Sequence, residues 1–274
     1  MLIKRKSIEA EGNYRSGPSA TKKNPGGRPA KFAPITLSEH DGVRYLHFGT
    51  KWVQGAMRLR KPDWLELEYA QQMMAWNLFH RAPQHIAQLG LGTGALTKFC
   101  YRFFPSAKVT AVELNPAVIN ICESMFKLPQ QDARLNVLEM DAMNFVTDQD
   151  RHDTLDVLQV DLYDATAKGP VLDTTEFYQG CFDCLKSDGV MTVNLFGDHP
   201  SFAKNIKVLR YVFGTVLCMP EVHDGNVVAL CFKARLKLDL DLLKVRAEEI
   251  SQETKLPTQS WIHGLALTQL PASN

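Results

Sequence analysis

Runs of apolar residues that favour strands alternate with helix-forming stretches from His85 onward. Expected strands cover 85–90, 108–113, 134–139, 155–161, 189–196, 214–219 and 226–233, and expected helices cover 94–104, 116–127, 142–148, 174–186, 201–213 and 238–252. This alternation is typical of a mostly parallel, doubly wound α/β sheet. The last two strands have no helical pattern between them, so we expect them to pair as an antiparallel hairpin at one edge. Residues 256–274 carry no clear signal.

A second β pattern precedes this region. Two β-rich runs between Pro34 and Gly49 flank Asp41-Gly42, which is a strong hairpin signal, and a third expected strand covers 51–59. These strands predict a small antiparallel unit that must pack on another part of the chain, because it is too small to be stable alone. The apolar pattern of 64–79 predicts one mostly buried helix.

Residues 1–34 differ in composition from the rest of the chain. They hold eight Lys and Arg against two Glu, with many Gly, Pro, Ser and Asn. Such a stretch buries too little apolar surface to offset its ordering entropy, so we expect a disordered basic tail. A solvated tail is the commoner outcome for this composition, and we therefore do not expect nucleic-acid binding.

Charge and cysteine usage narrow the class of protein. The net charge is +1 over 274 residues, and no apolar run is long enough to cross a membrane or to follow Lys4-Arg5-Lys6 as a targeting signal. The six cysteines are scattered through apolar segments, which favours buried thiols in the cytoplasm. Cys181 and Cys184 form a Cys-x-x-Cys without a second pair, so we expect core packing and no metal.

The most informative stretch is the glycine loop after the first parallel strand. It reads Gly90-Leu-Gly92-Thr93-Gly94, and Glu113 ends the next strand 19 residues later. Glycines let the chain turn tightly and let a ligand approach the backbone, while a carboxylate at this spacing can accept hydrogen bonds from ribose hydroxyls. The combination predicts nucleoside binding.

Further acids follow the later strands. Asp141 follows the third, Asp161 ends the fourth, and Asp164 lies just beyond. Ligands of open α/β sheets bind at the carboxyl ends of the strands, where this acidic rim would attract a cation. Asp141 also has the position of a helix N-cap.

The pair Asp161 and Asp164 is the sharpest chemical feature. An amine must lose its proton before it attacks the carbon beside a sulfonium, and a nearby carboxylate can accept that proton. A second carboxylate can hold the acceptor in line, and Tyr163 can present an aromatic wall to the cation. The alternative is that Asp161 and Asp164 have no chemical role and only form a polar turn after the strand.

The combined pattern resembles the spermidine synthase family, aminopropyltransferases with the class I methyltransferase fold, a Rossmann-like fold. The resemblance runs from about Tyr45 to Lys233 and includes Trp52-Val53-Gln54-Gly55, Tyr69, Val112-Glu113-Leu114-Asn115, Asp141-Ala142, Asp161-Leu-Tyr-Asp164 and Phe177-Tyr178. It implies a β unit at 35–62, a catalytic domain at 63–274 and a homodimer.

The resemblance also implies residue roles. Glu113 would bind ribose, while Asp141 and Ala142 would bind adenine. Asp161 would be the base and Asp164 would hold the acceptor amine, such as putrescine. Gln54 and Tyr69 would contact the donor, decarboxylated S-adenosylmethionine.

The chain departs from the family pattern in its glycine loop. The family has an Asp that contacts the aminopropyl ammonium, where this chain has the neutral Thr93. Tyr69-Ala70-Gln71 also replaces the family's Tyr-His-Glu. Two alternatives therefore stay open: a methyltransferase that uses intact S-adenosylmethionine, and a catalytically lapsed protein that binds a nucleoside or polyamine.

Overall fold

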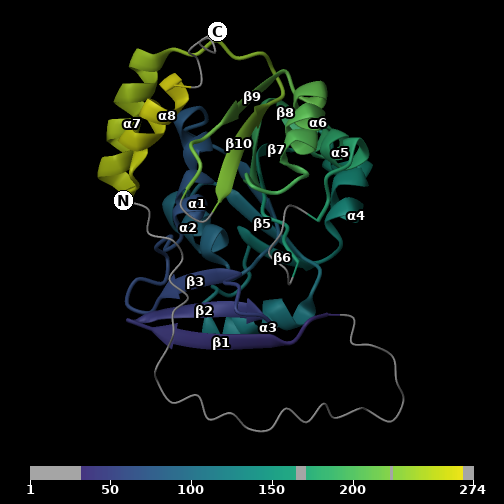
Figure 1. Cartoon of the computed structure of the whole chain (residues 1–274), viewed down its shortest axis with the longest axis vertical. Coiled ribbons are helices and arrows are strands. Elements are labelled where there is room, and N and C mark those ends of the chain that lie inside the picture. Colours follow the sequence, from purple (N-terminus) through teal and green to yellow (C-terminus); the bar gives the residue numbers. More distant parts are fainter. Residues whose placement is uncertain (1–31, 165–170, 223–224, 268–274) are drawn as a thin grey trace, which may run out of the picture.

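The structure is a computed structural model that describes residues 32–164, 171–222 and 225–267. The basic tail expected at 1–34 lies almost wholly outside the described residues, so its disorder stays a prediction. The remaining chain forms one large sheet flanked by helices and one small separate sheet (Figure 1).

The large sheet has seven strands in the order β6-β5-β4-β7-β8-β10-β9. Their bounds are β4 (His85–Leu89), β5 (Lys108–Glu113), β6 (Leu135–Glu139), β7 (Leu155–Val160), β8 (Leu185–Phe196), β9 (Thr215–Cys218) and β10 (Asn226–Phe232). The first five strands of this order pair in parallel, and β10 pairs antiparallel with both β8 and β9. The expected doubly wound sheet with an antiparallel hairpin at one edge is confirmed.

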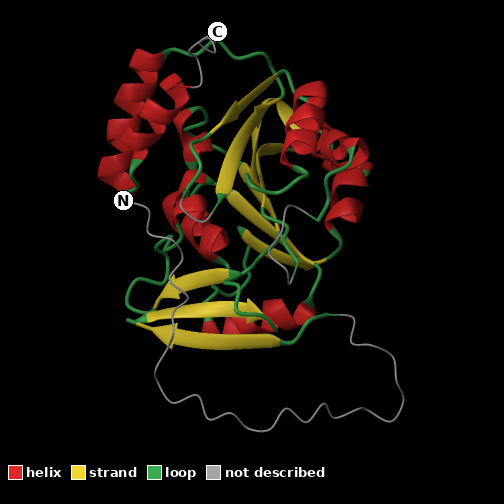
Figure 2. Ribbon diagram, in the orientation of Figure 1, coloured by secondary structure: helices red, strands yellow, loops and turns green. Residues whose placement is uncertain are grey.

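Helices cover both faces of this sheet (Figure 2). They are α2 (Ala95–Phe103), α3 (Pro116–Met125), α4 (Ala142–Thr147), α5 (Thr175–Cys184), α6 (Phe202–Val212), α7 (Leu240–Thr254) and α8 (Thr258–Leu267), with a 3₁₀ turn η2 (Gln149–Arg151) after α4. The first six follow the predicted ranges closely, whereas α8 lies in a stretch for which the sequence analysis assigned no element.

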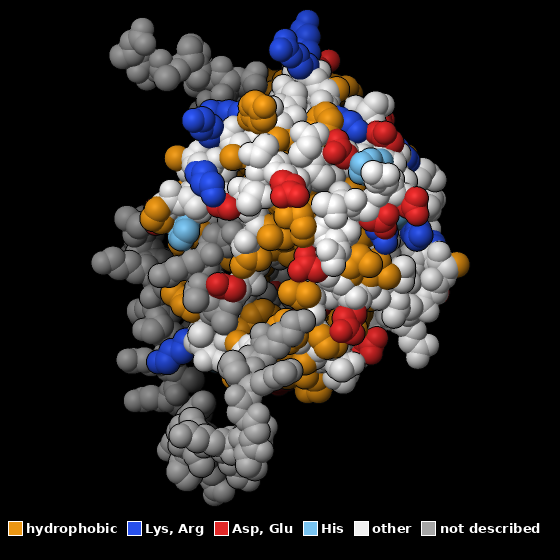
Figure 3. Space-filling view, turned by 90° about the vertical axis from the view of Figure 1, so that its right-hand side faces the viewer, with side chains coloured by type: hydrophobic (Ala, Val, Ile, Leu, Met, Phe, Trp, Pro, Cys, Tyr) orange, Lys and Arg blue, Asp and Glu red, His pale blue; other side chains and the backbone are white. Residues whose placement is uncertain are grey.

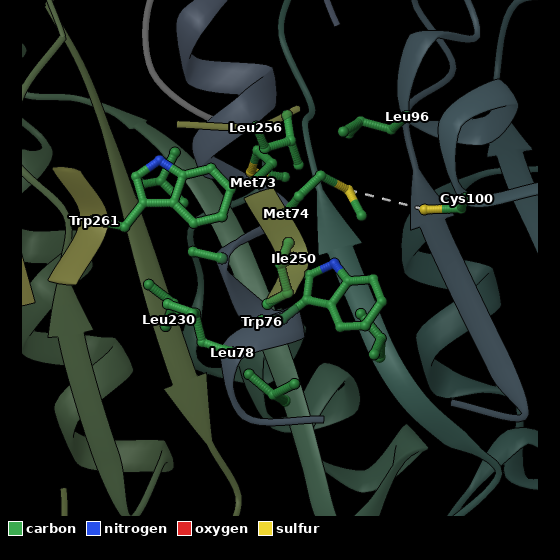
Figure 4. Close-up of a cluster of buried hydrophobic side chains, with 14 of the residues drawn as sticks. Met73, Met74, Trp76, Leu78, Leu96, Cys100, Leu230, Ile250, Leu256 and Trp261 are labelled. Carbon is green, nitrogen blue, oxygen red and sulfur yellow. Dashed lines mark hydrogen bonds between the residues drawn. The ribbon is translucent and has the colours of Figure 1, made fainter. Parts of the chain in front are cut away.

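The helix α8 completes the largest hydrophobic cluster. Trp261 on α8 and Ile250 on α7 are almost completely buried, together with Trp76 and residues of the central strands. Figure 4 shows Trp76 and Trp261 among the side chains of this cluster, with Ile250 between them. Burial of such large side chains contributes about 1.5–3 kcal/mol each, which explains why a short C-terminal helix is held against the sheet.

The single helix expected at 64–79 is wrong. The segment forms a short helix α1 (Glu68–Gln72) and a separate 3₁₀ turn η1 (Ala75–Leu78), with Met74 between them at φ −88° and ψ 0°. The carbonyl of Met73 accepts hydrogen bonds from the buried side chains of Gln159, at 3.1 Å, and Thr192, at 3.2 Å. Side chains of the sheet thus donate to a carbonyl that would accept a backbone hydrogen bond in a continuous helix.

The small sheet is built as predicted, from β1 (Ile35–His40), β2 (Val43–Phe48) and β3 (Gly55–Arg58) in antiparallel order. Asp41 and Gly42 both have positive φ, as a tight hairpin turn requires. The third strand is shorter than the expected 51–59. A cluster that includes Leu46, Met57 and Phe126 packs this sheet against α3, so it is stabilised by the large unit.

Cys181 and Cys184 are buried free thiols within the second hydrophobic cluster, which confirms core packing. Within the described ranges, no helix has the length and apolar character needed to cross a membrane. The same ranges contain no group of three or more His, Cys, Asp or Glu side chains that could hold a metal ion.

Candidate active site

The glycine loop brings two strand ends into close contact. Gly90 has φ +93°, and a Cβ at this position would lie 2.2 Å from the backbone oxygen of Asp161. The amide of Asp161 in turn donates to the oxygen of Leu89 at 2.9 Å. A residue with a side chain cannot occupy position 90 without moving Asp161, so this glycine sets the position of the acid.

Glu113 at the end of β5 braces the same loop. Its Oε2 accepts from the amide of Leu91 at 3.1 Å, and its Oε1 accepts from the amide of Asn115 at 2.8 Å. Burial raises the pKa of Glu113, and these backbone hydrogen bonds oppose that rise. A carboxylate has about four lone-pair sites, so both oxygens keep capacity to accept from ribose hydroxyls.

A cavity of about 590 Å³ lies at the carboxyl ends of the strands, between the two sheets. The predicted site residues that line it are Gln54, Tyr69, Gly90, Gly92, Glu113, Asp141, Ala142, Asp161, Tyr163 and Asp164. Apolar side chains such as Phe48 and Met140 line much of the rest. Figure 3 shows one face of the molecule, on which acidic side chains lie among hydrophobic and basic ones. The size suits a nucleoside, because ligand cavities are typically of about 300–1,000 Å³.

Two predicted residues do not line this cavity. Thr93 is 2% exposed and faces β3, where its hydroxyl donates to the oxygen of Ala56 at 3.4 Å. Gly94, at φ +65°, is the residue before α2, and a Cβ there would lie 2.9 Å from Leu128. Both residues therefore shape the loop, and their contact with a donor stays a prediction.

Asp161 is the centre of the polar contacts in the cavity. Its Oδ1 accepts from Asn194 Nδ2 at 2.9 Å, and its Oδ2 accepts from the hydroxyl of Tyr69 at 3.3 Å. Burial raises the pKa of Asp161, while these two hydrogen bonds lower it. A carboxylate whose pKa is raised in this way binds a proton more readily than an exposed one, as a general base requires.

The segment after β7 places the second acid and the aromatic residue. Tyr163 is half-buried and donates from its hydroxyl to the backbone oxygen of Asn194 at 3.1 Å. Burial raises the pKa of this phenol, so it stays protonated. Gln54 Nε2 donates to the backbone oxygen of Asp164 at 3.1 Å, which joins the small sheet to the acidic segment.

Asp141 serves as the N-cap of α4, since its Oδ1 accepts from the amide of Met143 at 2.7 Å. It also lines the cavity beside Ala142. Capping and ligand contact do not exclude each other, so the proposed adenine contact is compatible with the observed cap.

Two lining residues were missed by the sequence analysis. Asn194 on β8 and Asn226 on β10 are 2% and 8% exposed, and both line the cavity. Asn226 begins β10, whose other residues are all apolar, and Asn194 lies in the mostly apolar second half of β8, which is a signal that the sequence offered. Buried amides need partners, so a polar residue within such a strand indicates a buried network or a site.

The fold is shared with solved structures of low sequence identity. A probable spermidine synthase from Corynebacterium glutamicum ATCC 13032 aligns with TM-score 0.67 and 19% identity over 88% of this chain and 93% of that chain. Human methyltransferase-like protein 13 in complex with SAH aligns with TM-score 0.62 and 22% identity over 70% of this chain and 94% of that chain. At this identity, the likeness establishes the class I methyltransferase-like fold alone.

Sequence comparisons identify the family. Residues 66–213 match the model of the spermine/spermidine synthase domain. A polyamine aminopropyltransferase of Neisseria meningitidis serogroup A is 35% identical over 87% of this chain and 92% of its own length. One from Chromobacterium violaceum is 30% identical over 88% of this chain and 93% of its own length. The chain therefore belongs to the spermine/spermidine synthase family.

Proposed function

We propose that this protein transfers an aminopropyl group from decarboxylated S-adenosylmethionine to an amine such as putrescine. The observation that carries this proposal is the charge of the cavity. Glu113, Asp141, Asp161 and Asp164 line it, and no Lys, Arg or His is among the described residues that do so. Such a cavity favours a donor with a sulfonium and an ammonium, and an acceptor with further ammonium groups.

In the proposed reaction, Asp161 accepts a proton from the acceptor ammonium. The freed nitrogen lone pair attacks the aminopropyl carbon beside sulfur, and the C–S bond breaks with its electrons remaining on sulfur. The positive charge passes from sulfur to nitrogen, so the products are a secondary ammonium and a neutral thioether, and the proton taken at the start remains on Asp161. Asp164 holds the acceptor, Glu113 the ribose, and Asp141 and Ala142 the adenine. Gln54 and Tyr69 contact the donor.

The same cavity disfavours intact S-adenosylmethionine. Its carboxylate would find no cationic partner among the described lining residues and would face four acids. The lack of a charge-assisted hydrogen bond to this carboxylate costs about 1.5–3 kcal/mol, or about one to two decades in affinity. The neutral Thr93 does not change this expectation, because it faces β3.

We expect decarboxylated S-adenosylmethionine to raise the melting temperature at concentrations at least about tenfold lower than those of the intact form. A ligand that binds only the folded state adds about 2.7 kcal/mol of stability at 100 times its Kd. The measurement is a thermal-shift titration of the full chain with each donor, followed by mass spectrometry of the products formed with putrescine. A larger shift with the intact donor would instead favour a methyltransferase, and no shift with either would favour a lapsed enzyme.

We also propose a cytoplasmic homodimer. The exposed strand β1 at the edge of the small sheet supports this assembly, since unpaired strand edges favour pairing with another chain. We also propose that the chain divides between residues 62 and 63 into the small β unit and the catalytic domain.

A further inference from the structure

Asn194 and Asn226 form a buried polar connection between two neighbouring strands. They lie on β8 and β10, the antiparallel pair of the large sheet, where Asn226 is opposite Phe196. Asn226 Nδ2 donates to Asn194 Oδ1 at 3.0 Å, and Asn194 Nδ2 donates to Asp161 Oδ1 at 2.9 Å. The two amides thus point head to tail toward the carboxylate.

The direction of this chain has a chemical consequence. An Asn side chain has a donor end and an acceptor end, and the two ends differ little in shape. Asn226 occupies the acceptor end of Asn194, which leaves the donor end for Asp161. An ionised carboxylate only accepts hydrogen bonds, so this orientation stabilises the ionised form.

We propose that Asn226 and Asn194 are positioning residues that act as a hydrogen-bond relay, which holds Asp161 ionised and oriented toward the acceptor amine. The inference rests on the proposed role of Asp161 as the base. Asn194 touches the base, whereas Asn226 reaches it through Asn194 and also forms a side-chain hydrogen bond with Tyr163.

Among the described residues around Asp161, only hydrogen-bond donors can stabilise its ionised form. Tyr69 of α1 donates to it, Tyr163 and Asp164 lie on its own segment, and Glu113 and Asp141 face the same cavity from neighbouring strand ends. No cationic side chain is among the described residues that line the cavity. Burial raises the pKa of Asp161, and the amide of Asn194 is the first of the two donors that oppose it.

The first test is Asn226→Leu, which removes the donor to Asn194 Oδ1 without adding charge. The Asn194 amide then loses its fixed orientation, and its oxygen can turn toward Asp161 and stabilise the protonated form. We expect the acid limb of the kcat/KM profile to move to higher pH. On that limb kcat/KM falls about tenfold, whereas on the alkaline plateau it falls less than about threefold and the donor KM is unchanged.

Asn226→Asp should move the acid limb further in the same direction. A carboxylate at position 226 accepts from the Asn194 amide, which turns the Asn194 side chain around so that its oxygen faces Asp161. Asn115→Asp is the matched control for charge alone. It adds a carboxylate to the same cavity and keeps the N-cap of α3, which Asn115 provides through its Oδ1. A relay requires that Asn226→Asp shift the profile more than Asn115→Asp does.

A second readout separates the relay from the catalytic role of Asp161. The carboxyl carbon of Asp161 can be titrated by NMR in protein labelled with ¹³C-aspartate, with its resonance assigned by its loss in Asp161→Asn. An upward shift of this titration in Asn226→Leu supports the relay even if Asp161 were not the base. An unchanged titration overturns the relay. Asn226→Ala provides the same comparison if the leucine variant does not fold.

Discussion

Asp161→Asn is expected to abolish turnover while leaving donor binding intact. The amide cannot accept the proton of the acceptor amine, and general base catalysis contributes about 10²–10⁴ to a rate. Asn is nearly isosteric and can still accept from Asn194 and contact Tyr69, so the cavity keeps its shape. The measurements are kcat with saturating substrates and the donor-induced shift in melting temperature.

The stability of the same variant tests the environment of Asp161. Burial raises the pKa of this carboxyl above its unfolded value, so the folded protein binds the proton more tightly than the unfolded chain does. The resulting stabilisation is present at low pH and is lost as the pH rises through the folded-state pKa. Since Asn carries no charge, we expect Asp161→Asn to melt at the same or a higher temperature than the wild type above that pH.

Asp241→Asn provides a control for the chemical change itself. Asp241 lies in the first turn of α7, where its side chain is exposed and pairs with Lys244. This variant should keep wild-type turnover. Wild-type turnover in Asp161→Asn would exclude this residue as the base, and loss of donor binding would show that its role is mainly structural.

The acidic rim could be predicted from the sequence because it depends on one general rule. Glu113, Asp141 and Asp161 each follow a strand that the apolar pattern reveals, and the carboxyl ends of parallel strands meet at one edge of a sheet. Strand order was not needed to bring these residues together. The hairpin at Asp41-Gly42 could also be predicted from a local signal, because both residues are of types that favour the positive φ they adopt.

The missed features depend on long-range contacts. The break after α1 arises because Gln159 and Thr192, far along the chain, bond to the carbonyl of Met73. The relay from Asn226 to Asp161 requires β10 to lie antiparallel beside β8, which places three distant segments in contact. No local pattern around Met73 or Asn226 contains this information, although an Asn at the start of the apolar strand β10 was a usable signal.

Glu113→Gln is expected to weaken donor binding by about two orders of magnitude. Glu113 accepts from the amides of Leu91 and Asn115 with different oxygens, so it holds the glycine loop while it faces the cavity. A glutamine keeps one acceptor but turns an NH₂ toward the other amide, and it also loses an acceptor for a ribose hydroxyl. Hydrogen bonds to a charged group contribute about 1.5–3 kcal/mol each, which corresponds to a factor of about 10–100.

The neighbouring strand offers a matched control for this change. Glu139 ends β6 directly opposite Glu113 in the sheet register, but it is exposed and does not line the cavity. Glu139→Gln should therefore bind the donor like the wild type. In Glu113→Gln, the donor KM should rise about 100-fold, and the thermal shift should vanish at donor concentrations that saturate the wild type. Because proton transfer is the task of Asp161, kcat at saturating donor should change much less than KM. A variant with unchanged KM but reduced kcat would contradict the assignment of Glu113 to the ribose and place it in the chemical step.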